Sequence, residues 1–332
     1  MKFLPFALAA VFLWITALSG AIAAEPPGSW SREWKSTDFS RSLVEFDEIR
    51  SGGPPKDGIP AIDNPQYVAV ADAGDIGELE PVITVTLNGE MRAYPVRILI
   101  WHEIANDTLG GVPIAVTFCP LCNSALVFER RIDGQVYDFG TTGKLRNSDL
   151  VMYDRQTESW WQQFTGEAII GKMMGTRLPA LPVRIESFER FRARAAEYPG
   201  ATILVPTRAR MRNYGANPYS RYDHSTKPFL YDGALPENIA PLARVIVIGE
   251  EAWSLELVKN LKRVERGDLT ITWEAGQNSA LDTTVIRLGR DVGNVVVQRD
   301  GPDGPEDVVH DISFAFAFHA FHPEAPIHTE VK

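Results

Sequence analysis

The sequence predicts an α+β fold: a single β-rich domain with a few short helices. Short runs of β-branched residues recur between turn residues from position 81 onwards, as at 82–87, 112–118 and 125–130. Helical periodicity is confined to short stretches at 96–103 and 187–198. The 332-residue chain is 45% hydrophobic and 23% charged, which is typical of a folded globular protein and excludes a disordered or fibrous one.

The first 24 residues have the pattern of a secretory signal peptide. A single charged residue, Lys2, precedes an apolar run from Phe3 to Leu18, and small residues follow up to Ala24. A membrane anchor would usually end at a charged flank, whereas this run ends in small residues. We therefore expect a signal peptide over 1–24 and a periplasmic or secreted protein with no transmembrane anchor after cleavage.

The remaining chain is expected to divide into a lead-in segment over 25–80 and a main domain over 81–332. The lead-in is polar and is interrupted by Gly52-Gly53-Pro54-Pro55, so we expect it to pack loosely. In the main domain, Asn88-Gly89 predicts a two-residue hairpin turn directly after the strand at 82–87.

Three further elements follow from local signals. Pro95 suits the first turn of the first helix, and Ser187 is a candidate N-cap of the second. Near the end of the chain, Phe314, Phe316 and Phe318 alternate with alanines, and this alternation predicts a half-buried strand.

The second half of the chain weakly echoes the first. The run Val245–Glu250 resembles Val85–Glu90, and an alanine followed by an aromatic residue comes shortly after each run. Strand–turn–strand patterns also look alike without common origin, so two diverged repeats, over 81–180 and 245–322, are one of two open interpretations. If the repeats exist, the first one carries the cysteines and therefore the function.

Charge limits the class of partner. The chain carries 33 basic and 43 acidic residues, a formal charge of -10, without a concentrated basic patch. An acidic protein of this kind repels phosphates, so nucleic acid is not an expected partner. We expect a small ligand or a metal ion instead.

Cys119-Pro120-Leu121-Cys122 is the central chemical motif of the chain. Two cysteines separated by two residues can direct both sulfurs to one point, which suits a metal site or a redox disulfide. The residues after Cys122 indicate a strand rather than a helix, which weakens a thioredoxin-like interpretation, and Asn123 excludes a haem attachment motif. A ligand pair, a reactive thiol and a structural disulfide all stay open.

A metal site needs further ligands besides the two sulfurs. His102 is the only histidine in the first half of the chain, and Met152 could add a thioether. Two thiolates, an imidazole and a thioether form a soft ligand set that favours copper(I), with zinc as the second choice. The predicted metal ligands are Cys119, Cys122, His102 and Met152.

A thiol-dependent redox protein or a small-molecule enzyme is the alternative on the same residues, so enzymatic activity stays open. One cysteine would act as nucleophile and His102 or Glu103 as base. Polar and aromatic residues after Gly140 could then hold a small substrate. The candidate substrate-binding residues are Glu103, Asn147, Asp149, Trp161 and Gln162. The third possibility is a non-enzymatic interaction module with a structural disulfide.

The segments around the cysteines also resemble a known family. They are Ala93-Tyr94-Pro95, Trp101-His102-Glu103, Thr117–Ala125, Leu145–Asp154 and Trp161-Gln162-Gln163. Together they are similar to an exported prokaryotic family of unknown function, DUF3179, and the resemblance extends from about Pro54 to the closing Phe321-His322-Pro323. It implies a coherent exported family and supplies neither an activity nor a ligand.

Overall fold

Tight turns between short apolar strands build the chain into antiparallel hairpins. In the computed structural model, which describes residues 25–207 and 212–330, Asn88 and Gly89 join β3 to β4 with φ angles of 50° and 81°. Positive φ at both turn residues matches the twist of the flanking strands. The predicted hairpin is therefore confirmed. The predicted signal peptide over 1–24 lies outside the described residues.

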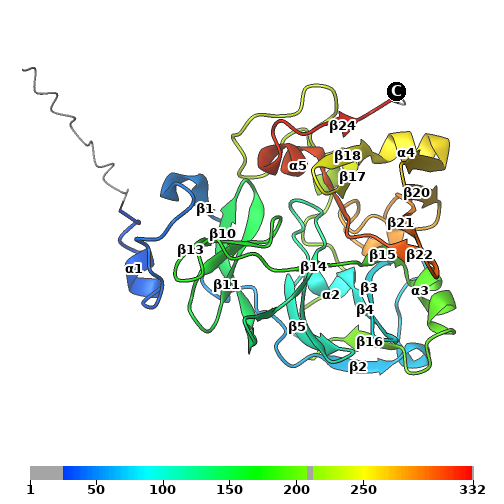
Figure 1. Ribbon diagram of the computed structural model, residues 1–332, viewed down its shortest axis with the longest axis horizontal. Helices are drawn as coiled ribbons and strands as arrows, with labels where there is room; N and C mark the ends of the chain where they lie inside the picture. Colours follow the sequence, from blue (N-terminus) through cyan, green and yellow to red (C-terminus); the bar gives the residue numbers. More distant parts are fainter. Residues whose placement is uncertain (1–24, 208–211, 331–332) are drawn as a thin grey trace, which may run out of the picture.

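Five sheets of four or five strands follow one another around the molecule in a propeller-like ring, named here sheets A to E (Figure 1). The described chain is thus β-rich with a few short helices. Sheet A contains β1 (Ile49–Ser51), β10 (Phe139–Arg146), β11 (Asp149–Asp154), β12 (Trp160–Gln162) and β13 (Glu167–Ile170). Sheet B contains β14 (Ala180–Leu181), β7 (Val127–Glu129), β6 (Val112–Thr117) and β5 (Ile104–Leu109).

The other three sheets complete the ring, and a small hairpin lies beside it. Sheet C contains β15 (Arg184–Ser187), β3 (Pro81–Leu87), β4 (Glu90–Pro95), β16 (Thr202–Val205) and β2 (Gln66–Ala69). Sheet D contains β19 (Arg263–Arg266), β20 (Leu269–Glu274), β21 (Asn294–Gly301) and β22 (Gly304–Asp307). Sheet E contains β23 (Asp311–Phe314), β17 (Arg244–Ile248), β18 (Glu251–Ser254) and β24 (Ile327–His328). The separate hairpin is β8 (Arg131–Ile132) with β9 (Gln135–Val136).

Buried polar side chains of β5 join sheet B to both of its neighbours. The Asn106 amide donates to the Phe139 carbonyl at 2.8 Å and accepts from the Phe139 N–H at 2.9 Å, which connects sheet B to sheet A. Asp107 accepts from Arg92 at 2.6 Å and from the Tyr94 hydroxyl, which connects sheet B to sheet C. Such fully paired buried groups fix how adjacent sheets meet.

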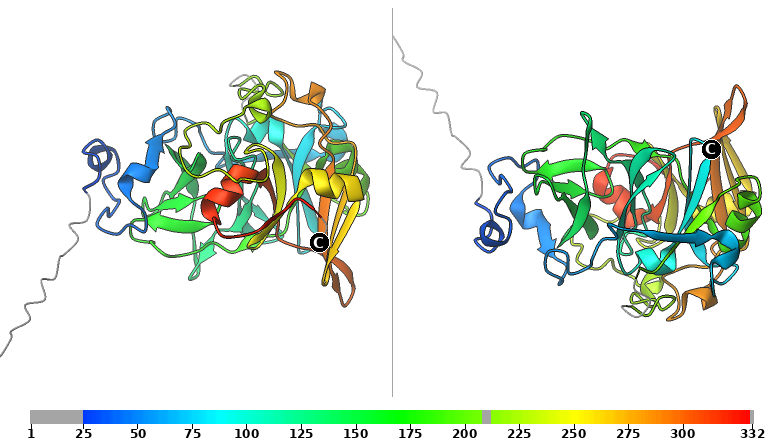
Figure 2. Two further views of the ribbon diagram at one scale, coloured as in Figure 1. Left: turned by 90° about the horizontal axis from the view of Figure 1, so that it is seen from above. Right: turned by 90° about the horizontal axis from the view of Figure 1, so that it is seen from below.

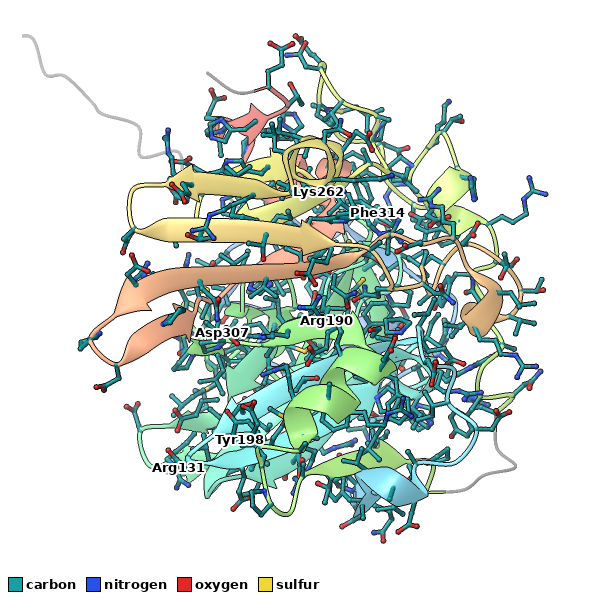
Figure 3. The ribbon with its side chains drawn as sticks, turned by 90° about the vertical axis from the view of Figure 1, so that its right-hand side faces the viewer. Arg131, Arg190, Tyr198, Lys262, Asp307 and Phe314 are labelled. Carbon is teal, nitrogen blue, oxygen red and sulfur yellow. The ribbon has the colours of Figure 1, made fainter. Side chains whose placement is uncertain are left out.

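Sheets C and D are joined in the same way. The Ser187 N–H donates to the Asn294 side chain at 2.8 Å, and Arg184 forms an ion pair with Asp307 at 2.6 Å. Figure 3 shows the long strands of sheet D on the same side of the molecule as α3, with Arg190 and Asp307 labelled where the two layers meet.

Five short helices in the described residues connect or cover the sheets. Helix α4 contacts both sheet D and sheet E. Phe321 of α5 stacks on Phe164, which lies between β12 and β13 of sheet A, with ring centroids 4.9 Å apart, and this contact closes the ring. The predicted N-cap of α3 is confirmed, because the Ser187 hydroxyl accepts the Arg190 N–H. The helices are α1 (Trp30–Glu33), α2 (Val96–Leu99), α3 (Phe188–Ala195), α4 (Leu255–Leu261) and α5 (Ala315–Phe321).

The strand predicted around Phe314, Phe316 and Phe318 is wrong. Phe314 ends β23, and the next two phenylalanines belong to helix α5. Residues 314–318 are all fully buried, so this part of the helix has no solvent-facing side. Because this part of the helix has no polar face, its hydrophobic residues do not recur every three to four positions. The Phe–Ala alternation has instead the two-residue period that is typical of a strand.

The lead-in packs more closely than the sequence suggested. Trp30 and Trp34 are buried against Trp160 of β12, with ring centroids 4.8 and 5.1 Å apart, and β1 pairs with β10 at the edge of sheet A. Figure 2 shows this N-terminal part, in blue, beside sheet A at one end of the molecule. Aromatic packing compensates for the polar composition of this segment.

The two-repeat interpretation does not describe this architecture. The range 81–180 supplies strands to sheets A, B and C, whereas 245–322 supplies strands to sheets D and E. The echo in the sequence corresponds to two local units of hairpin and helix, β3–β4–α2 and β17–β18–α4. Similar hairpins give similar patterns without a repeat of the whole half.

Candidate metal centre

The Cys-x-x-Cys motif forms a closed loop between β6 and β7. The Cys119 N–H donates to the Ser124 carbonyl at 2.8 Å and the Ser124 N–H donates back at 3.2 Å. Asn123 has φ of 52°, a left-handed conformation that asparagine tolerates better than most residues. Both cysteines are free thiols with at most 1% of their surface exposed.

The hairpin β10–β11 delivers Asp149 to this loop. Arg146 pairs with Asp149 across a two-residue turn, in which Asn147 and Ser148 have φ of 53° and 64°. The Ser148 carbonyl lies 3.9 Å from the Cys119 Sγ. One ligand atom each from Cys119, Cys122 and Asp149 lie within 4.8 Å of one another, and we call these three residues the Cys–Asp cluster.

The Asp149 carboxylate is held at one oxygen. Gln162 Nε2 and the Phe164 N–H both donate to Oδ2, at 2.7 and 2.9 Å. The other oxygen, Oδ1, is buried without a hydrogen-bond partner among the described residues. The Cys119 and Cys122 thiols beside it are weak S–H donors that lower the Asp149 pKa. A cation bound there would compensate the buried carboxylate more fully than these thiols do.

Glu103 adds a second buried carboxyl beside the cluster. It follows α2 in a left-handed conformation with φ of 60°, which is uncommon outside glycine and asparagine and occurs often at functional sites. Two backbone hydrogen bonds hold it there, from its N–H to the Leu99 carbonyl at 2.7 Å and from the Phe118 N–H at 2.8 Å. Burial and the nearby Asp149 raise the Glu103 pKa to about 8.

Burial shifts every acidic group of this site toward its protonated form. It raises the pKa of Asp149 to about 6, raises that of Cys119, and raises that of Cys122 well above the ordinary value. No lysine or arginine in the described residues forms an ion pair with Glu103 or Asp149. The site thus concentrates four groups that can become anionic in an environment without a counter-cation.

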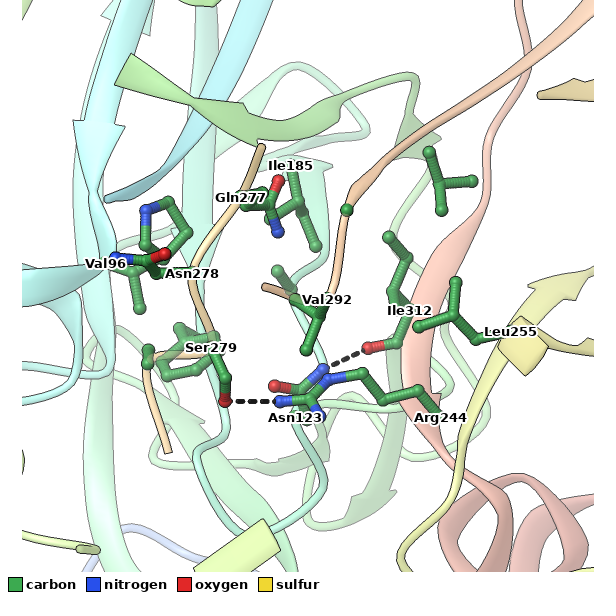
Figure 4. Close-up of a pocket in the computed structure, with 16 residues that line it drawn as sticks. Val96, Asn123, Ile185, Arg244, Leu255, Gln277, Asn278, Ser279, Val292 and Ile312 are labelled. Carbon is green, nitrogen blue, oxygen red and sulfur yellow. Dashed lines mark hydrogen bonds between the residues drawn. The ribbon is translucent and has the colours of Figure 1, made fainter. Parts of the chain in front are cut away.

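A second acidic group in the described residues already has its cations. Asp223, His224 and Asp282 also lie close together, but Arg244 and Arg290 contact the Asp223 carboxylate at 3.2 and 3.1 Å. Figure 4 shows Arg244 donating to Ser279 in the pocket beside the cysteine loop. Because two arginines balance these carboxylates, this group has little need of a metal ion.

The structure does not bring His102 into the Cys–Asp cluster. Its Nδ1 contacts the Pro60 carbonyl at 2.7 Å and its Nε2 contacts the Tyr214 hydroxyl at 2.8 Å, so both ring nitrogens have partners. Met152 is fully buried in β11, with Thr141 and Trp161 as its cross-strand neighbours. Of the four residues expected to bind a metal, only Cys119 and Cys122 therefore belong to the cluster, and Asp149 is its third member.

The candidate substrate residues take different places. Glu103, Asp149 and Gln162 meet at the site, whereas Asn147 forms the hairpin turn and is partly exposed. The Trp161 indole donates to Asp154 at 2.9 Å and its ring packs edge-on against Phe139, so Trp161 belongs to the core.

Sequence reasoning missed two tyrosines near the site. Tyr219 and Tyr222 come from the long connection between β16 and β17, and burial together with the neighbouring acidic groups raises the pKa of each hydroxyl. For Tyr219 these neighbours are Glu103 and Cys119, and for Tyr222 they are the two thiols. No local motif surrounds either tyrosine, so the sequence offers no signal that could have found them.

Comparison with protein-family models decides the relationship of the chain. Residues 56–325 match the model described as "Protein of unknown function (DUF3179)". The chain belongs to this family. The match to DUF3179 extends from the segment before β2 to the loop between α5 and β24 and includes the whole Cys–Asp cluster. No curated protein and no solved structure matches the chain significantly. In the described residues, no helix has the length and apolar character needed to cross a membrane.

Proposed function

We propose that this DUF3179 protein binds a divalent transition metal ion, zinc in first place, through the Cys–Asp cluster. The observation that carries the proposal is the convergence of Cys119, Cys122 and Asp149 within 4.8 Å in a buried site where no lysine or arginine of residues 25–207 and 212–330 pairs with Asp149. Ligand atoms around a tetrahedral zinc ion lie about 3.3–3.8 Å apart, as Zn–S and Zn–O bond lengths require. Small side-chain movements would therefore complete the ligand set.

The ligand chemistry favours zinc over copper. The sequence alone favoured copper(I) because it grouped the cysteines with His102 and Met152. With Asp149 in place of the imidazole, the set combines two thiolates with a hard oxygen donor, which suits zinc better than copper(I). Glu103 is the candidate fourth ligand, because its carboxyl is buried beside Asp149.

The burial of the cluster supports a structural role for the ion. Cys122 and Asp149 have no exposed surface, and a catalytic zinc needs an open position for water or substrate. A bound ion would connect the loop of sheet B to the first residue of β11 in sheet A. We also propose an exported location, where metal ligation would protect the two thiols from oxidation.

A thiol-based redox function is the second candidate, because the two sulfurs lie close together beside Glu103, a buried group able to exchange protons near neutral pH. The raised thiol pKa values count against it, since the thiolate is the reactive form. The same thiols oxidised to each other would make a structural disulfide instead.

Metal content of matched variants tests the proposal. The protein is purified without added metal and without oxygen, and zinc, copper and iron are measured together with free thiols. We expect near-stoichiometric zinc in the wild type and loss of it in Cys119→Ser, Cys122→Ser and Asp149→Asn.

Asp154→Asn is the control, because Asp154 is an equally buried carboxylate at the other end of β11. Metal retained in Asp149→Asn, or lost equally in Asp154→Asn, would contradict the proposal. A metal-free wild type with no free thiols would support the disulfide.

A further inference from the structure

A pocket other than that of Figure 4 lies where sheets A, B and E meet, and no residue of the Cys–Asp cluster lines it. Its apolar walls include Phe128 from sheet B, Phe164 from the side of sheet A and Val247 from sheet E. Four polar side chains, those of Thr165, His310, Asp311 and His322, also line it. An apolar pocket with a few converging polar groups is the usual form of a small-molecule site. We call it the three-sheet pocket.

Asp311 carries a buried and unbalanced charge. Its Oδ1 accepts the Ala125 and Ile312 N–H groups at 2.9 and 2.8 Å, and its Oδ2 is buried without a well-formed hydrogen bond among the described residues. The neighbouring Ser124 hydroxyl lowers the Asp311 pKa but brings no positive charge. Only 4% of the residue is exposed, and no lysine or arginine in the described chain forms an ion pair with it. Burial raises its pKa to about 6, so the group is still largely ionised at neutral pH.

The two histidines do not supply the missing positive charge. Burial lowers the pKa of both His310 and His322, so both imidazoles are neutral at neutral pH. The nearest charges that act on His322 are Glu250 and Arg177, which oppose each other. His310 contacts the Val308 carbonyl through Nδ1 at 2.8 Å, which leaves its other nitrogen available to a ligand.

We propose that the three-sheet pocket binds a small organic ammonium ion with a flat apolar body. The ammonium group would donate to Asp311 Oδ2, a charge-assisted hydrogen bond, and would supply the positive charge that no lysine or arginine in the described part of the chain provides. The aromatic rings of Phe128 and Phe164 would contact the apolar body and attract the cation. A carboxylate of the same shape is excluded, because it would meet the Asp311 charge without compensation.

Three probes of one shape test this inference: benzylamine, benzyl alcohol and benzoate, titrated into the intact protein by calorimetry. We expect saturable binding of benzylamine, about tenfold or more tighter than that of benzyl alcohol, and no binding of benzoate. Asp311→Asn removes the charge and is expected to abolish the preference for the amine. Asp154→Asn, a buried carboxylate outside the pocket, is expected to keep it.

A second variant keeps the test informative if Asp311→Asn does not fold. Ala180 is an exposed residue at the rim of the pocket, so Ala180→Phe is compatible with folding and would obstruct entry. It is expected to weaken benzylamine binding by about tenfold or more. Equal binding of amine and alcohol, an unchanged preference in Asp311→Asn, or no binding of benzylamine would overturn the inference. The metal content of Cys119→Ser tests the proposed metal site alone, so its outcome neither supports nor contradicts ligand binding in the three-sheet pocket.

Discussion

At the scale of single residues, Asp149 gives the site its chemical character. Its Oδ2 is fixed by Gln162 and the Phe164 N–H, while its Oδ1 has no partner among the described residues. This division leaves one oxygen held in place and the other available to a metal ion. Groups that orient a metal ligand contribute strongly to affinity without touching the ion.

Gln162→Leu is therefore expected to lower zinc affinity by about 10–100-fold, because Asp149 loses its orienting donor. Competition with a chromophoric chelator measures the change. Gln163→Leu is the matched control, since Gln163 donates to Thr117 at 2.9 Å rather than to Asp149. Equal losses in the two variants would show that the effect is general destabilisation.

The raised carboxyl pKa values predict how stability changes with pH in the metal-free protein. Folding raises the pKa of Glu103 from 4.5 to about 8 and that of Asp149 from 3.8 to about 6. The folded state holds these protons more tightly than the unfolded chain, so their stabilising effect is complete below pH 4 and is lost as the pH rises to about 8. The Tm of metal-free protein should fall from pH 5 to 8.5.

Glu103→Gln should make the decrease of Tm with pH smaller, because the loss of stability at the higher pH values comes from deprotonation of Glu103. Bound metal should reverse the trend, since its ligands must be deprotonated and binding strengthens as the pH rises. Identical pH profiles for wild type and Glu103→Gln, both metal-free, would disprove the assignment.

At the scale of elements, the β10–β11 turn places Asp149 beside the cysteines at some conformational cost. Ser148 has φ of 64°, and its buried hydroxyl has no well-formed hydrogen bond among the described residues, although the Tyr222 hydroxyl lies beside it. Ser148→Gly should raise the free energy of unfolding by about 1 kcal/mol, because glycine adopts this conformation freely. Urea denaturation measures the change.

Asn147→Gly serves as the comparison within the same turn. Asn147 also has positive φ, but asparagine tolerates that conformation, so we expect a change of only a few tenths of a kcal/mol, roughly. A larger gain at position 147 than at 148 would contradict this account of the turn.

Elements with local signals were predicted correctly from the sequence. Asn88-Gly89 and Ser187 specify a turn and a helix start through their own backbone and side-chain chemistry. Helix α5 was mistaken for a strand because its phenylalanines are buried on all sides. Tertiary packing determines that element, and a local pattern cannot report it.

At the scale of the whole molecule, the Cys–Asp cluster lies where several sheets meet. The cysteine loop belongs to sheet B and Asp149 begins β11 of sheet A, while the Phe314 N–H at the end of β23 in sheet E donates to the Cys122 carbonyl at 2.8 Å. An ion bound there would tie together sheets that are far apart in sequence.

Removal of the metal by a chelator should therefore lower the Tm of the whole domain in one cooperative transition, because binding free energy adds to folding free energy. Differential scanning calorimetry measures it, and added zinc should restore the Tm. Cys122→Ser should show the low Tm with or without chelator. A chelator effect of equal size in that variant would place the stabilising metal elsewhere.

The sequence indicated half of this site. The spacing of Cys119 and Cys122 is local and revealed the sulfur pair, but the position of the third member, Asp149, depends on how sheets A and B pack. His102 was the chemically reasonable partner, yet Pro60 and Tyr214 take both of its nitrogens. Asp149 was predicted to bind a substrate rather than to lie beside the cysteines, because no spacing rule connects it to the loop.

X-ray absorption at the zinc edge of the protein purified without added metal tests the central claim most directly. The account predicts two sulfur ligands at about 2.3 Å and oxygen ligands at about 2.0–2.2 Å. Asp149→Asn should change the oxygen shell and leave the sulfur shell in any remaining zinc. A shell without sulfur, or a protein with free thiols and no metal, would contradict it.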